Sequence, residues 1–324
     1  MMDPDVQQRA RPRRVGGHLF ALGLGIAAVV AAFSFPVSVP GAQDSQREFA
    51  TPEKAAAALV AAVRVDDQPE ILRILGADGE KLIHSGDTVA DRQGRQRFIT
   101  AYDETHKVKI EGADTATLIV GTQSWSLPIP IAKKADRWHF DTVASARKII
   151  NRRVGRNELN VIEVCRAYVE AQREYASEDR LGNGLHEYAQ KFDSHPGRHD
   201  GLYWEAAAGE GQSPLGPLVV KARAQGYTDD DHGFDPAPYH GYFYRILTRQ
   251  GAHAPGGAKD YVAAGHMTQG FGLVAFPARW GDSGIMTFIV NQDGIVFQKN
   301  LGPQTAELAR KITEFDPDPS WATP

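Results

Sequence analysis

The stretch 157–175, NELNVIEVCRAYVEAQREY, decides the fold of the second half of this chain, because it predicts one long amphipathic helix. Asn157 is a helix-capping residue type. Apolar side chains then recur at helical spacing, at Leu159, Ile162, Cys165, Tyr168 or Val169, and Tyr175. Because Cys165 lies on this stripe, we expect a buried small hydrophobe. The alternative, a catalytic thiol, needs an exposed electropositive setting.

An antiparallel sheet is predicted after this helix and a long irregular region. Residues 179–241 are rich in Gly, Pro, His and aromatic side chains, and only 214–225 within them show a helical pattern. Apolar and β-branched runs then predict strands at 242–248, 270–276, 284–290 and 295–299. Residues 291–294 join the last two strands as a hairpin turn, and a final helix is predicted at 305–312.

The first half reads as helices followed by a sheet. Thr51, Pro52 and Glu53 start the first predicted helix, and further helices are predicted at 70–75 and 90–106. Strands are predicted at 107–111, 115–120, 124–131 and 137–141. Pro128 and Pro130 lack amide donors on the same side, so this part of the sheet must be a free edge.

The predicted fold class is α+β with two domains. Residues 49–150 would form a cone of helices and antiparallel strands similar to the nuclear-transport-factor-2-like fold. A basic helix at 143–154, ended by Gly155, would bridge to a second domain at 151–324.

The first 42 residues predict export from the cytoplasm. Four arginines between residues 9 and 14 precede an uncharged apolar run at 19–35, and small residues follow at 38–42. This order is typical of a signal peptide, although the run is also near the lower limit for an uncleaved membrane anchor. We therefore expect a periplasmic or secreted protein, anchored in the inner membrane only if the segment is kept.

The composition narrows the class of partner. The chain has 324 residues, a net charge of −4 and a single cysteine, so it forms no intramolecular disulfide. A weakly acidic protein has no overall attraction for phosphate backbones. We expect no nucleic-acid partner, and contact with a membrane only through the N-terminal segment.

Five sequence motifs carry a resemblance to a known family. They are YVEAQREY (168–175), DRLGNGLHEYA (179–189), DGLYW (200–204), PYHGYFYR (238–245) and MTFIVNQDG (286–294). With them the chain resembles a family of exported bacterial proteins classed as a domain of unknown function (DUF2950), from Phe49 to Trp321. The resemblance implies export but no particular chemistry.

The second half also resembles the globular head of type IV pilins and pseudopilins, which have a long helix, an irregular loop and an antiparallel sheet. In pilins the processing site ends in a glycine, and a glutamate follows five residues into the apolar segment. Here the apolar segment that follows Gly17 contains no glutamate. The resemblance therefore implies a pilin-like head used as a module, and not a polymerising subunit.

Two polar loops are candidates for metal binding or catalysis. Asp179, Asn183 and Glu187 resemble the start of a calcium loop, but Leu181 supplies no side-chain oxygen where a ligand is needed. His195, His199 and Asp200 place two imidazoles near a carboxylate, which is the basis for a metal-dependent hydrolase. The alternative for both is an ordinary structural loop, in which the polar side chains accept hydrogen bonds from backbone N–H groups.

The preferred candidate binding surface is aromatic and consists of Tyr203, Trp204, Tyr239, Tyr242 and Tyr244. Because strand side chains alternate, Tyr242 and Tyr244 share one sheet face, and the alternative is that they belong to the core.

We thus expect an exported non-catalytic envelope protein, a binding or assembly module for an unknown envelope protein or small molecule. It would need no cofactor, with calcium as the single alternative. The rival function is a secreted metal-dependent hydrolase centred on His195–Asp200.

Overall fold

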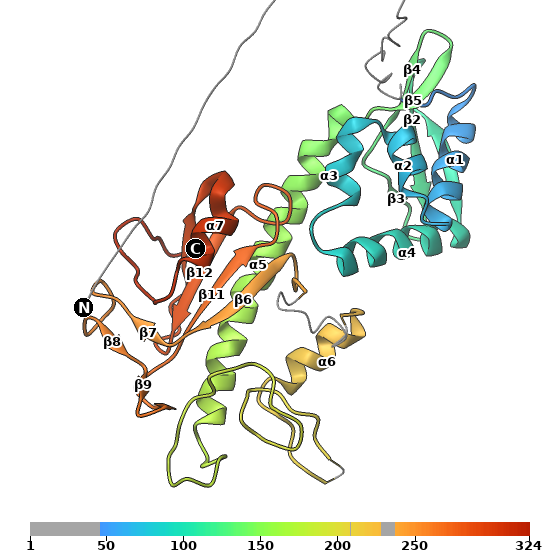
Figure 1. Cartoon of the computed structure of the whole chain (residues 1–324). Helices are drawn as coiled ribbons and strands as arrows, with labels where there is room; N and C mark the ends of the chain where they lie inside the picture. Colours follow the sequence, from blue (N-terminus) through green and yellow to red (C-terminus); the bar gives the residue numbers. More distant parts are fainter. Residues whose placement is uncertain (1–45, 208, 228–236) are drawn as a thin grey trace, which may run out of the picture. The chain divides into compact units, whose positions relative to one another are not determined.

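The structure, a computed structural model, describes residues 46–207, 209–227 and 237–324 (Figure 1). These residues form an α+β arrangement of helices and antiparallel sheets, as the sequence predicts. The predicted export segment at 1–42 lies outside them. Within the described residues, no helix combines the length and the apolar character needed to cross a membrane.

The first layer consists of four α-helices: α1 (Pro52–Arg64), α2 (Gln68–Leu75), α3 (Glu80–Ile83) and α4 (Thr88–Glu104), with a 3₁₀ turn, η1 (Ala77–Gly79), before α3. Acceptor side chains cap three of them: Thr51, Asp67 and Asp87 each accept a hydrogen bond from a first-turn amide. The predicted starts of the first two helices are confirmed within two residues.

The helices cover an antiparallel sheet of short strands. Its members are β1 (His106–Ile110), β2 (Thr115–Val120), β3 (Trp125–Ser126), β4 (Ile131–Lys134) and β5 (Arg137–Phe140), in the order β1-β2-β4-β5 with β3 also paired to β2. Alternate residues of β2, namely Ala116, Leu118 and Val120, are buried against the helices in one apolar cluster.

The prediction of one strand at 124–131 is wrong. The chain pairs at β3, leaves the sheet at Leu127, and pairs again only from Ile131. Pro128 and Pro130 lie in this break, where their missing amide donors interrupt no ladder.

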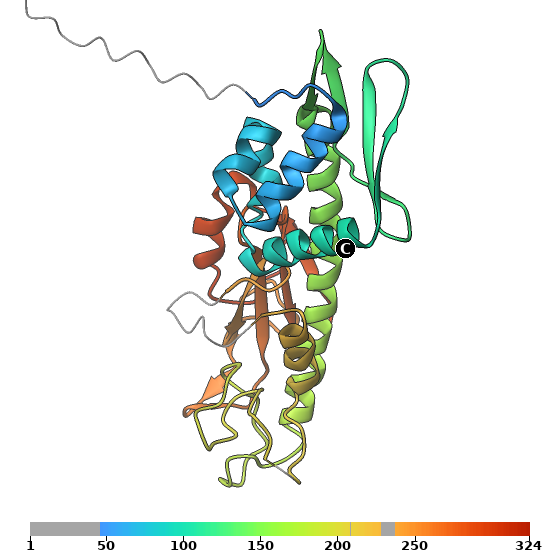
Figure 2. The same cartoon turned by 90° about the vertical axis from the view of Figure 1, so that its right-hand side faces the viewer.

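The next element, α5 (Thr142–Tyr175), is a single helix of 34 residues (Figure 2). The prediction of two helices separated at Gly155 is therefore wrong, and the predicted domain boundary at 150/151 lies inside α5. Gly155 has a negative φ and continues the helix, which costs only about 1 kcal/mol relative to alanine. Asn157 does not cap a helix, because its side chain donates to the Ser283 carbonyl at 2.9 Å.

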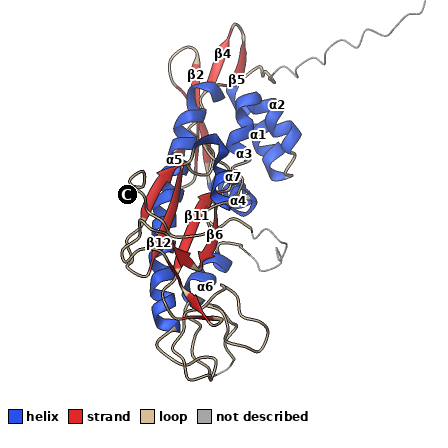
Figure 3. Cartoon of the chain, turned by 60° about the vertical axis from the view of Figure 1, so that its left-hand side comes forward, coloured by secondary structure: helices blue, strands red, loops and turns tan. Residues whose placement is uncertain are grey.

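A four-stranded antiparallel sheet packs on the second half of α5 (Figures 1 and 3). Its order is β13-β12-β11-β6, from β6 (Tyr242–Leu247), β11 (Gly272–Pro277), β12 (Met286–Asn291) and β13 (Phe297–Asn300). The four predicted strands are thus confirmed, with boundaries shifted by up to two residues. Gly294 has a φ of 78° in the predicted hairpin turn.

Both faces of this sheet are covered. Leu273 and Ala275 of β11 lie in the cluster formed with α5, whereas Val274 and Phe276 lie in a second cluster that includes Ala309 of α7 (Thr305–Arg310). This alternation explains why every residue of β11 is buried.

Short elements complete the chain. They are α6 (Gly216–Ala224), β7 (Arg249–Gln250), β8 (Lys259–Asp260), β9 (Val262–Ala263), β10 (His266–Met267) and the 3₁₀ turn η2 (Gly302–Gln304). The irregular region before β6 is held to α5 by the buried Gln172 amide, which donates to the Ala189 carbonyl and accepts from the Ala189 amide, both at 2.8 Å. The sequence pattern did not predict β7–β10, because two-residue strands carry no detectable periodicity.

The continuity of α5 predicts opposite effects of two substitutions at Gly155. A Cβ there would meet no atom within 4 Å, so Gly155→Ala should raise the free energy of unfolding by about 0.5–1 kcal/mol. Gly155→Pro should lower it by about 3 kcal/mol or more, because proline removes a helical hydrogen bond. Urea unfolding followed by circular dichroism measures both. Equal tolerance of alanine and proline would contradict a continuous helix.

Candidate functional site

The best-formed candidate site is a pocket between α4, α5 and the segment that joins β3 to β4; we call it the α4–α5 pocket. It has a volume of about 510 Å³, within the range of about 300–1,000 Å³ typical of small-molecule sites. Side chains of α1, α2 and α3 complete its walls. Those used below are Leu59, Ile71, Leu82, Phe98, Trp125, Leu127, Ile129, Ile149, Ser85, Asp87, Asp91, Gly94, Arg95, Arg97, Arg152, Arg153 and Arg156.

The interior of the pocket is apolar because it opens onto the core beneath the helices. Leu59 and Ile71 belong to the buried cluster between the helices and the first sheet, and Phe98 and Ile149 pack against the same cluster from α4 and α5. The break between β3 and β4 adds an apolar wall, in which Ile129 is buried.

Two of the arginines in the pocket wall already have partners. Arg95 forms an ion pair with Asp66 at 2.9 Å. Arg153 donates to the carbonyls of Lys81 and Leu82 at 2.8 and 2.7 Å, and these bonds hold α5 against α3. Burial lowers the pKa of Arg153 from its ordinary value, although the residue stays cationic at neutral pH. Both side chains therefore have structural roles.

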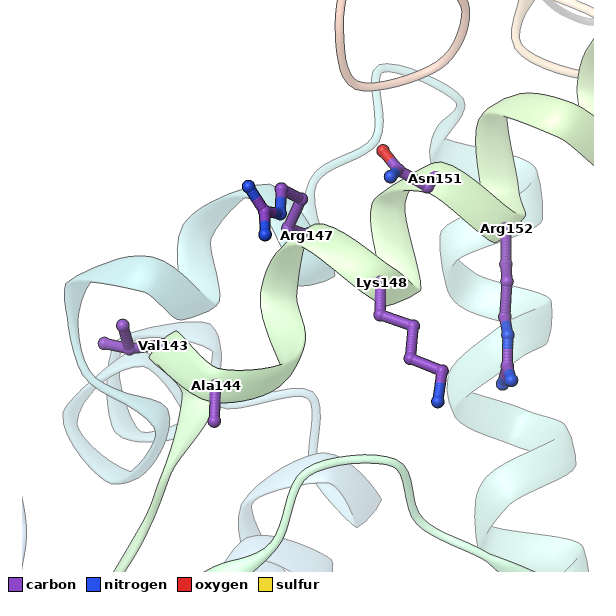
Figure 4. Close-up of a pocket in the computed structure, with 6 residues that line it drawn as sticks. All are labelled: Val143, Ala144, Arg147, Lys148, Asn151 and Arg152. Carbon is purple, nitrogen blue, oxygen red and sulfur yellow. The ribbon is translucent and has the colours of Figure 1, made fainter.

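Three other arginines are exposed and lack a carboxylate partner among the described residues: Arg97 of α4, and Arg152 and Arg156 of α5. Arg152 and Arg156 are one helical turn apart and so share a helix face. Figure 4 shows Arg152 and Lys148 pointing to the same side of α5, while Arg147 points away from it. The six residues drawn there, from Val143 to Arg152, all belong to α5 and line an open surface pocket formed by this one helix.

Two carboxyl groups also line the pocket, Asp87 and Asp91. Asp91 accepts a hydrogen bond from the Ser85 amide at 2.8 Å, and burial raises the pKa of Asp91 above its ordinary value. Asp87 is only 1% exposed. It caps α4 at Ala90 (2.9 Å) and also accepts from the Tyr227 hydroxyl (2.7 Å) and the Gly241 amide (2.9 Å).

Asp87 therefore ties the helical layer to the segment that enters β6. Gly241 has a φ of 76°, and a Cβ there would come within 2.7 Å of the Asn157 amide nitrogen. Only glycine fits this approach without a shift. Burial raises the pKa of Tyr227, and the adjacent Asp87 carboxylate raises it further, so the hydroxyl stays a donor.

The two histidines of the predicted hydrolase site have different acidic partners. Asp200 binds His195 at 2.7 Å and Lys191 at 2.8 Å. His199 instead pairs with Glu210 at 2.8 Å and stacks on Trp204. Burial works against ionisation of Asp200, but the bonds from Lys191 and His195 outweigh it and lower the pKa of Asp200.

The predicted calcium residues are also used within the fold. Asp179 accepts from the amides of Asn183 and Gly184, chiefly the latter, and these bonds lower the pKa of Asp179. Glu187 accepts a hydrogen bond from the side-chain amide of Asn183 at 2.7 Å and lies 3.1 Å from the Nδ1 atom of His266. In the part of the chain that is described, no three His, Cys, Asp or Glu side chains are grouped to hold a metal ion.

The aromatic residues lie mostly within the core on the α5 side of the second sheet. Tyr242 is fully buried and donates to the Met286 carbonyl at 3.0 Å, and Trp204 is 8% exposed. Tyr203 and Tyr244 are partly buried against the same cluster. Tyr239 contacts the ring of Tyr227 near Asp87. A binding role for these five side chains stays a prediction.

Cys165 is fully buried, as its place on the apolar stripe predicts. Burial raises the pKa of its thiol to about 12, so the reactive thiolate is suppressed at neutral pH.

The sequence did not predict the α4–α5 pocket. The pattern at 143–154 predicts only a basic helix, and no periodic pattern relates its arginines to Leu59, Phe98 or Ile129. The one available signal was the density of arginine at 147–156, which lies between two apolar clusters once α5 is continuous.

Comparison with known proteins identifies a family. The model of the family described as "Protein of unknown function (DUF2950)" matches residues 46–323. No curated protein and no solved structure matches the chain.

The three bonds of Asp87 predict a large effect of its removal. Asp87→Ala should lower the free energy of unfolding by about 2–4 kcal/mol, because α4 loses its cap, and the buried Gly241 amide and the partly buried Tyr227 hydroxyl lose their acceptor. Chemical denaturation measures the change. Asp103→Ala is the control, since Asp103 pairs with Arg64 at the surface and should have little effect. Similar losses for the two variants would contradict the role given to Asp87.

Proposed function

From the membership of this chain in the DUF2950 family of unknown function, we propose that it is an exported, non-catalytic envelope protein that binds a small molecule in the α4–α5 pocket. The observation that carries the proposal is the combination of a 510 Å³ volume, an apolar interior and arginines in the wall. Concave apolar sites with a few polar groups are the usual form of ligand sites.

The geometry supports binding better than hydrolysis. A hydrolase at His195–Asp200 needs a base with an accessible, tuned imidazole near the reacting atom. Here His195 and His199 have separate acidic partners, and Asp200 is held by Lys191. The wall residues of the α4–α5 pocket include no cysteine or histidine, and the one serine, Ser85, is buried and accepts a hydrogen bond from the Asp87 backbone amide at 3.2 Å.

Export belongs to the proposal and is supported by the arginine-rich start and the apolar run at 19–35. We also propose that the first layer is a nuclear-transport-factor-2-like cone and that α5 with its sheet is a pilin-like head. The support is the order of elements: helices before a small antiparallel sheet, then one long helix under four strands. An experimental structure with α5 turned away from β12 would remove that support.

The pocket can be tested by filling it at Gly94. This residue lies within α4, and a Cβ there would meet no atom within 4 Å, so Gly94→Leu fits and projects into the pocket. The fluorescent probe N-phenyl-1-naphthylamine is apolar and uncharged, and we expect the native protein to bind it with increased emission. Gly94→Leu should weaken that binding at least about tenfold, which corresponds to about 1.4 kcal/mol.

Gly155→Leu is the matched control, because Gly155 is also a helical glycine with open space but lies outside the pocket wall. It should bind the probe as the native protein does, and both variants should unfold at or above the native temperature. Equal probe binding by all three proteins would refute the pocket as the site. Export would be refuted if the protein isolated from its own cells were found in the cytosol with residues 1–42 still attached.

A further inference from the structure

The charges around the α4–α5 pocket are unbalanced. Arg97, Arg152 and Arg156 have no carboxylate partner among the residues described, whereas Arg95 is neutralised by Asp66. The wall has two carboxyl groups, Asp87 and Asp91, which accept hydrogen bonds from neutral donors. Five arginines face them in the wall, and only one of these is paired with the outside residue Asp66, so the wall carries a net positive charge beside an apolar interior.

We infer that the ligand of this pocket is a single-chain anionic amphiphile, with its carboxylate or phosphate on Arg152 and Arg156 and its alkyl chain along Leu59, Phe98 and Ile129. The inference rests on the proposed binding function and names the class of ligand. Guanidinium groups bind carboxylate and phosphate through paired N–H donors, so two of them one turn apart suit one small anionic group.

The volume and the walls favour this class of ligand over three others. A pocket of about 510 Å³ lies in the lower half of the usual range for ligand sites, which favours one chain over a two-chain lipid. A cationic amphiphile would meet Arg97, Arg152 and Arg156 unshielded. A small anion without a chain would leave the apolar interior in contact with water, and so forgo the hydrophobic contribution.

The half-exposed Trp125 fits the same interpretation. It lies on β3 at the pocket wall and is 50% exposed, which is unusual for so large an apolar side chain. Trp125 and the neighbouring Leu127 would be covered by an alkyl chain that extends from the arginines into the pocket.

The test is displacement of bound N-phenyl-1-naphthylamine from the purified protein by four compounds that each carry one twelve-carbon chain, below their micellar concentrations. Dodecanoate and dodecyl phosphate should displace the probe at concentrations at least about tenfold lower than the concentration of dodecyltrimethylammonium that is needed. The displacing concentration of dodecanol should lie between those of the anions and that of the cation. Sodium acetate and inorganic phosphate should not displace the probe.

The double variant Arg152→Gln, Arg156→Gln should weaken dodecanoate binding about tenfold or more and dodecanol binding far less, because only the anionic group loses its contacts. The control is Arg147→Gln on the opposite side of α5, which should change neither. Arg152 and Arg156 are exposed in the native protein, and their replacement should not destabilise the fold. An unchanged unfolding temperature of the double variant checks this.

The outcomes separate the two proposals. If the probe binds in the pocket but the four compounds compete equally, or the cation competes best, the anionic ligand is refuted and the binding function stands. If inorganic phosphate or acetate alone competes, the site takes anions and not amphiphiles. If the native protein does not bind the probe, or if Gly94→Leu binds it as strongly as the native protein does, the proposed binding function itself is refuted.

Discussion

The structure depends on α5 running unbroken from Thr142 to Tyr175. Its first part contributes Ile149 to the apolar cluster of the helices and first sheet, and its second part contributes Cys165, Tyr168 and Tyr175 to the cluster of the second sheet. One rigid helix therefore fixes both cores. Because the helix does not break at Gly155, Arg152, Arg153 and Arg156 keep a fixed angular relation, and only then do they come together in the wall of the α4–α5 pocket.

The pocket is in turn coupled to the second sheet. Asp87 lies in its wall and binds Tyr227 and Gly241 from the segment that enters β6. Arg279, which follows β11, donates to the His84 carbonyl next to the same wall. The α3–α4 segment is thus held by side chains from distant parts of the sequence. A ligand that rearranged this wall would act on contacts that also support the second sheet, so we expect the pocket to be largely preformed.

Local sequence signals predicted the elements well where one interaction decides. Thr51 with Pro52, and Asp67 with Pro69, start helices because a cap and a fixed φ act within a few residues. They failed where tertiary contacts decide. Gly155 looks like a helix end, but packing on both sides keeps the helix intact. The pocket was missed for the same reason, since its wall joins residues from 59 to 156 that no local pattern relates. The histidine and calcium candidates were visible as residue types, but the separate partners of His195 and His199 depend on the folded loop.

The most direct test of the central claim measures the length of α5 in solution. Spin labels on Val143→Cys and Glu174→Cys, in a Cys165→Ala background, occupy exposed positions near its two ends. A continuous helix with a rise of 1.5 Å per residue separates the two backbone positions by about 46 Å, so double electron–electron resonance should give one narrow distance distribution near that value. A clearly shorter or broad distribution would show that α5 is bent or broken between the two labels, and would contradict the account.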